Sequence, residues 1–173
     1  MKKSLVLLLL FISSISWSQE TLNNNLKTYL SNNGILGYAQ VVDRMFDFFR
    51  QEYQTQQVPE TLWTELSSVK PEALNNMTQS IIHAYKKHFT DEELKKLLEY
   101  YNSEASIKAN SGLTLSDEEQ RIRHEFLDGA ISKKINESSE SLNNVIKNLT
   151  QEWSMQLFID TQAKLKAKGY AKQ

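Results

Sequence analysis

Among the residue types that most often carry chemistry, this sequence offers only three histidines, His83, His88 and His124, and no cysteine. His83 and His88 are five residues apart, so on a helix they point about 140° from each other. They therefore do not form the i, i+4 pair of a zinc-binding helix. A metal-dependent enzyme is the third of our functional hypotheses, with His83, His88 and His124 as ligands and either Glu93 or Glu125 as the fourth. Because the histidine spacing is unfavourable, our first expectation is that the protein has no metal and no cofactor.

Two acidic clusters could be mistaken for catalytic carboxylates. Thr90-Asp-Glu-Glu93 and Ser116-Asp-Glu-Glu119 both match the capping box, in which the hydroxyl accepts from the backbone amide three residues later. The glutamate then reaches back to the first backbone amide. Because general acid–base catalysis needs a carboxyl group with a shifted pKa in a cleft, we interpret Thr90, Glu93, Ser116 and Glu119 as helix-capping residues.

Other catalytic and nucleic-acid-binding motifs are missing from the sequence. It contains no Gly-x-Ser-x-Gly nucleophile elbow and no glycine-rich phosphate loop. Its formal net charge of −1 gives no sign of the basic face that nucleic-acid binding requires. The sequence therefore favours a non-enzymatic protein that binds no nucleic acid.

The first 18 residues have the order of a secretory signal peptide. Lys2 and Lys3 precede a short apolar block, and the small residues Ser16 and Ser18 stand at positions −3 and −1 of a cut before Gln19. The block is shorter than the roughly 20 residues that span a bilayer, which disfavours an uncleaved anchor. We predict a signal peptide at residues 1–18 and a periplasmic or secreted mature chain without a transmembrane segment.

Beyond residue 18, apolar residues recur at steps of three and four, which indicates helices. Five glycines and two prolines are few for a sheet protein. We predict an all-α fold, an antiparallel bundle of about six to seven helices in a single domain at residues 19–173. Pro59 is expected at the first helical position, and the helix after Thr90 has a stripe that reaches Ala105. The last helices are expected at about 117–134 and 138–168, either as two helices or fused into one.

The segment 83–110 resembles an exported bacterial helical family, the domain of unknown function 2059. The family has a Phe-Thr pair before an acidic Glu-Leu helix start, followed by an aromatic-Tyr-x-Ser-x-x-Gly-x-Lys run. The matching residues are Phe89, Thr90, Glu93, Leu94, Tyr100, Tyr101, Ser103 and Lys108. Two positions depart from the family, Glu104 in place of proline and Ser106 in place of glycine. The resemblance implies export and an all-α fold, and it implies no established activity.

Most aromatic residues lie on the apolar stripes and are expected in the core. Phe48 and Tyr100 lie off their stripes, so we expect them to be the most exposed. The candidates for a binding surface are Phe48, Tyr100, Tyr101 and Trp153. Our first hypothesis is a protein that binds another protein or an envelope component. The alternative is a carrier of a small apolar ligand between helices. The sequence leaves the oligomeric state open.

Overall fold

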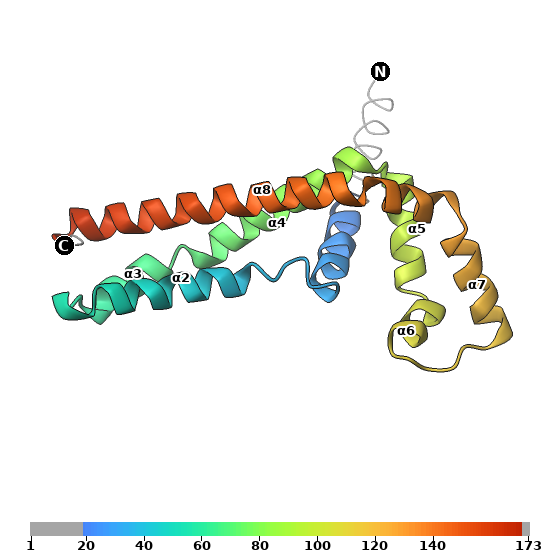
Figure 1. Ribbon diagram of the computed structural model, residues 1–173, viewed down its shortest axis with the longest axis horizontal. Helices are drawn as coiled ribbons and strands as arrows, with labels where there is room; N and C mark the ends of the chain where they lie inside the picture. The colour runs from blue at the N-terminus through green and yellow to red at the C-terminus, as the bar shows by residue number, and fades with distance from the viewer. Residues whose placement is uncertain (1–18, 171–173) are drawn as a thin grey trace, which may run out of the picture. The chain divides into compact units, whose positions relative to one another are not determined.

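The computed structural model describes residues 19–170, and every regular element in this part of the chain is a helix (Figure 1). Residues 19–32 are helical. The elements that follow are α2 (Ala39–Glu52), the 3-10 helix η1 (Gln54–Gln56), α3 (Glu60–Ser67), α4 (Lys70–His88), α5 (Asp91–Tyr101), α6 (Glu104–Asn110), α7 (Asp117–Leu127) and α8 (Ala130–Ala167). The prediction of an all-α fold is confirmed. The predicted signal peptide at 1–18 lies outside the described residues.

The described chain divides into two compact units. Unit 1 comprises residues 19–33 and 85–140, and unit 2 comprises residues 34–84 and 141–170. The long helices α4 and α8 each contribute residues to both units. The single domain at residues 19–173 stays a prediction, and each unit is described by itself below.

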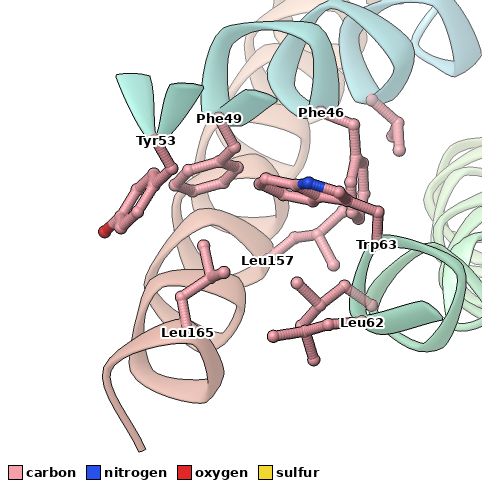
Figure 2. Close-up of a cluster of buried hydrophobic side chains, with 9 residues drawn as sticks. Phe46, Phe49, Tyr53, Leu62, Trp63, Leu157 and Leu165 are labelled. Carbon is pink, nitrogen blue, oxygen red and sulfur yellow. The ribbon is translucent and has the colours of Figure 1, made fainter. Parts of the chain in front are cut away.

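Unit 2 is built around an apolar cluster from α2, α3 and α8. Figure 2 shows Phe46 and Phe49 of α2, and Tyr53 directly after it, gathered beside the leucines of α3 and α8. The apolar residues of α2 fall at steps of three and four, so one helix face is buried. The buried members of the cluster are Val42, Phe46, Phe49, Tyr53, Leu62, Trp63, Leu66, Leu157 and Leu165.

Unit 1 combines a leucine core with a tyrosine cluster. Leu26, Leu30 and Leu94 are fully buried. The ring of Tyr29 contacts the rings of Tyr85 and Tyr101 edge to face, at centroid distances of 6.4 and 4.7 Å. Edge-to-face geometry is a favoured arrangement of aromatic rings because it brings the positive ring edge to the negative ring face. Edge-to-face contacts between tyrosine rings therefore contribute to the packing of unit 1, in addition to the buried leucines.

Both predicted capping boxes are present, and they begin α5 and α7. The Glu93 amide donates to the Thr90 hydroxyl at 3.2 Å, and the Thr90 amide donates to the Glu93 carboxylate at 2.8 Å. The same pair of bonds joins Ser116 and Glu119, at 3.3 and 2.7 Å. These bonds satisfy backbone amides that have no partner within the helix. Short-range residue patterns therefore set both helix starts.

Two predicted stretches are broken in the structure. The apolar stripe after Thr90 was expected to continue to Ala105. Instead α5 ends at Tyr101, because the Ser103 hydroxyl accepts from the Ser106 amide and begins the new helix α6. The predicted boundary between 134 and 138 is absent, as the fused alternative allowed, because α8 is continuous from Ala130. The break lies before α8, at Gly129. A Cβ atom at Gly129 would lie 2.9 Å from a backbone oxygen, so glycine allows this tight turn.

Smaller corrections concern Pro59 and the helix ends. Pro59 was predicted at the first helical position, but its backbone is extended and it is the cap residue just before α3, which begins at Glu60. Gly112 and Gly169 both have positive φ and end α6 and α8. After each glycine, the next amide donates back to a helical carbonyl, from Leu113 to Lys108 and from Tyr170 to Leu165. This bonding is the Schellman motif, which favours glycine.

Candidate binding groove

Unit 2 has an apolar groove between α2 and α8. Its volume is about 330 Å³. Seven of its eight lining residues are apolar, and Ser154 is the exception. The lining residues are Val41, Val42, Met45, Trp153, Ser154, Met155, Leu157 and Phe158. The groove can therefore hold apolar groups and offers them almost no hydrogen-bonding partner.

The Trp153 side of the groove is supported by a buried hydrogen bond. The Trp153 ring meets the Tyr38 ring edge to face, with 5.6 Å between centroids. The Tyr38 hydroxyl and the Thr78 hydroxyl of α4 form a hydrogen bond of 2.5 Å. Burial raises the pKa of Tyr38, so its hydroxyl stays neutral. Trp153 therefore lies against a fixed, uncharged neighbour.

The Phe158 side of the groove is continuous with the core. The ring of Phe158 stacks on the ring of Phe49, with 4.7 Å between centroids and 25° between planes. Phe48 lies at the edge, tilted against Phe158 at 6.3 Å. Apolar side chains remain in contact with water here, since Phe48 is 43% exposed, Met155 60% and Ile159 49%. This side of unit 2 is an exposed apolar surface beside a groove.

Two charged residues of α2, Asp43 and Arg50, form ion pairs with other helices. Asp43 accepts from Lys70 of α4 at 2.9 Å. Arg50 donates to Glu60 of α3 at 2.5 and 2.8 Å, and its guanidinium also lies over the Trp63 ring. None of these five residues lines the groove. The walls of the groove are therefore uncharged.

The four candidate aromatics from the sequence fall into two places. Trp153 lines the groove and Phe48 lies beside it, exposed as predicted. Tyr100 and Tyr101 belong to unit 1, where Tyr100 stacks on Phe126 with 3.8 Å between centroids and 5° between planes. Tyr100 is therefore half-buried rather than exposed, because a residue of α7 covers its ring.

The histidines are not brought together with other ligands. His83 and His124 are exposed, on α4 and α7, and His88 is half-buried at the end of α4. Within residues 19–170, no three His, Cys, Asp or Glu side chains are placed to hold a metal ion.

The capping glutamates act through ion pairs. Lys134 of α8 donates to both oxygens of Glu93, at 2.8 and 2.6 Å, and this holds the pKa of Glu93 below its ordinary value. Lys108 and the Ser116 amide and hydroxyl bind Glu119 and lower its pKa to about 2. Both carboxylates are therefore ionised at neutral pH and engaged in structural contacts.

Two buried tyrosines of unit 1 are held in their neutral form. Burial raises the pKa of Tyr85 to about 12, with a further contribution from Tyr101. Burial also raises the pKa of Tyr29, and the neighbouring tyrosines add to that shift. Their hydroxyl groups therefore keep their protons well above neutral pH.

Sequence reasoning missed the methionines of the groove. In the sequence, Met45 lies on the apolar stripe of its helix, as core residues do, and Met155 lies off the stripe of the last helix. The useful signal was that off-stripe position, shared by Met155 and Ile159. Their pairing with α2 could not be inferred, because it joins residues more than 100 positions apart.

Comparisons with known proteins find one family model that matches part of the chain, and they point to no activity. Within residues 19–170, no helix combines the length and the apolar character needed to cross a membrane. No curated protein and no solved structure matches the chain. Residues 75–110, which contain the α4–α5 junction and the Thr90 capping box, match the model of a family described as an uncharacterized protein conserved in bacteria (DUF2059), and this confirms the resemblance seen at 83–110.

Proposed function

We propose that the mature chain is exported to the periplasm or the medium and binds, without catalysis, an apolar helical segment of another protein in the groove between α2 and α8. The observation that carries the proposal is the groove of about 330 Å³ with uncharged, mostly apolar walls. The signal-peptide pattern of residues 1–18 supports export.

The dimensions of the groove suit the side chains of a partner helix. Val41 and Met45 on one side, and Ser154 and Phe158 on the other, are each four residues apart. Four residues of helix extend about 6 Å, which is the separation of side chains at i and i+4. Proteins recognise amphipathic helices through such apolar grooves, in which the helix inserts side chains at this spacing.

Methionines on the two walls support a surface that adapts to its partner. Met45 and Met155 face the groove from α2 and α8. A thioether side chain is flexible and polarisable, so it fits differently shaped apolar groups and makes favourable contacts with aromatic rings. A partner segment with leucine, methionine or phenylalanine at i and i+4 therefore fits this lining.

A photo-crosslinker at the groove tests the proposal. Met155→p-benzoylphenylalanine, expressed in the exporting bacterium, is expected to crosslink an apolar helical segment of one protein. The same crosslinker at the exposed position of Glu72 on α4 is the control. Equal capture from both positions, or capture of a segment without apolar i, i+4 residues, would contradict the proposal.

A titration then measures recognition directly. The crosslinked segment, made as a peptide, is titrated onto the wild type and onto Met155→Asp by calorimetry. A carboxylate in an apolar groove loses hydration without gaining a partner, so affinity should fall at least about tenfold. Because Met155 is 60% exposed, the variant should still fold, which circular dichroism verifies. Unchanged affinity would refute the groove as the binding site.

A carrier of a small apolar ligand is the second candidate. The groove volume lies at the lower end of the range for small-molecule sites, about 300–1,000 Å³. Such sites usually bury most of the ligand surface, whereas Met155 is largely exposed here, so the peptide is favoured. Native mass spectrometry of protein purified from the exporting cell would show a bound small molecule if the carrier hypothesis holds.

A further inference from the structure

The side chain of Gln19 is held at both of its polar atoms within unit 1. Its Nε2 donates to Oδ2 of Asp91 at 2.5 Å, and its Oε1 accepts from Nζ of Lys86 at 2.9 Å. Lys86 and Asp91 also form an ion pair with each other, at 3.8 Å. The two bonds join the beginning of the described chain to residues 67 and 72 positions later.

An N-terminal glutamine has a characteristic reaction. Its unprotonated α-amine attacks Cδ of its own side chain, the new N–Cδ bond closes a five-membered lactam, and the Cδ–Nε2 bond breaks. One proton of the amine passes to the departing nitrogen, so ammonia leaves and the terminus loses its basic group. The reaction needs no oxidant, reductant or second substrate.

We propose that Lys86 and Asp91 form a clamp that protects the N-terminus of the mature protein from this reaction. The inference rests on the proposed export and on the predicted cut before Gln19. Ring closure requires the Gln19 side chain to fold back onto its own nitrogen. In the clamped arrangement, Nε2 is turned toward Asp91 of α5 and Oε1 toward Lys86 of α4, so both hydrogen bonds must break first.

The expected protection is moderate because the clamp is exposed to water. Gln19 is exposed, and the side chains of Lys86 and Asp91 keep 22% and 32% of their accessible surface. The net contribution of one hydrogen bond corresponds to about a fivefold change in population. The folded protein should therefore lose ammonia at least about fivefold more slowly than a synthetic peptide of residues 19–25 at the same pH.

Two substitutions separate the clamp from simple electrostatics. Lys86→Met removes a positive charge, which favours the protonated amine and by itself slows closure. Asp91→Asn removes a negative charge, which favours the free amine and by itself speeds closure. Lys86→Met removes the donor to Oε1, and Asp91→Asn weakens the charge-assisted bond from Nε2. The side chain is released more often in both variants, so we expect faster ammonia loss in both. Lys87→Met and Glu92→Gln make the same charge changes at neighbouring positions and serve as controls.

The experiment follows ammonia loss by intact mass in purified mature protein, after sequencing of its N-terminus, with circular dichroism to verify folding of each variant. The proposal holds if Lys86→Met and Asp91→Asn both accelerate the loss and the controls keep the wild-type rate. It is overturned if the wild type reacts as fast as the peptide, or if Lys86→Met reacts no faster than Lys87→Met. The proposal is also overturned if sequencing shows that the mature chain begins at a residue other than Gln19. Peptide binding in the groove of unit 2 is tested by separate experiments and does not depend on that result.

Discussion

In unit 2 the interior is an apolar cluster of phenylalanine, tryptophan and leucine, and part of its apolar surface stays open to water in the groove. In unit 1, capping boxes fix the starts of the short helices α5 and α7. Ion pairs from Lys108 and Lys134 bind the glutamates of those boxes. The difference shows two ways of stabilising helices in one chain. Unit 2 relies on apolar packing beside its exposed groove, and unit 1 relies on hydrogen bonds and ion pairs at the sharp turns between its helices.

The largest expected effect is in the core of unit 2. Phe49 is 1% exposed and stacks on Phe158, so Phe49→Ala removes buried surface and leaves a cavity. We expect a loss of about 3–5 kcal/mol in the free energy of unfolding, measured by urea titration with circular dichroism. Phe48→Ala, at a ring that is 43% exposed, should lose less than about 1 kcal/mol. Similar losses in both variants would contradict a core on one face of α2.

The next effect concerns the tight turn in unit 1. In Gly129→Ala, the new Cβ meets backbone oxygens of Glu125 and Phe126 at 2.9 and 3.1 Å. Because backbone atoms yield poorly, we expect a loss of about 1–3 kcal/mol in the free energy of unfolding. Gly112→Ala meets no atom within 4 Å and strains only its positive φ, so about 1 kcal/mol is expected there. A neutral Gly129→Ala would show that the α7–α8 turn relaxes freely.

A capping residue should contribute less than the turn. Thr90→Ala removes the hydroxyl that accepts from the Glu93 amide, and we expect a loss of about 1 kcal/mol. Hydrogen exchange should then show faster opening of the first turn of α5. Thr64→Ala lies inside α3 of unit 2, where alanine is the better helix former, so little or no loss is expected. Equal effects at the two threonines would argue against the cap.

Acid should affect unit 1 through Glu119. The hydrogen bond from Lys108 and those from Ser116 lower its pKa to about 2, from an ordinary value of 4.5. Because the folded value is the lower one, this stabilisation is complete above about pH 4.5 and is lost as the pH falls toward about 2. Glu119→Gln should flatten that fall in a pH series of thermal unfolding. Lys108→Met should move the loss of stability to higher pH, because the pKa of Glu119 is then lowered less. An unchanged pH profile in both variants would show that the Lys108–Glu119 ion pair does not stabilise the fold.

The features that the sequence predicts are those encoded over short distances. The capping residues Thr90 and Ser116, and the apolar faces that bury Phe46 and Phe49, follow from spacing within one helix. The break at Gly129 was placed several residues too late, because local apolar periodicity continues through it. The sequence suggested an apolar site between helices and named Trp153 among its candidates. It did not predict the lining of the groove, since the lining needs Met45 and Met155 to meet across two helices, and only tertiary structure brings them together.

The positions of the tryptophans have a practical consequence. Trp63 and Trp153 both belong to unit 2, and residues 19–33 and 85–140 of unit 1 contain none. A chain that starts at Gln19 also lacks Trp17. Indole emission excited at the red edge of absorption therefore comes from unit 2 alone, and Trp153 places one emitter in the wall of the groove. The protein carries its own optical reporter of groove occupancy, with no dye attached.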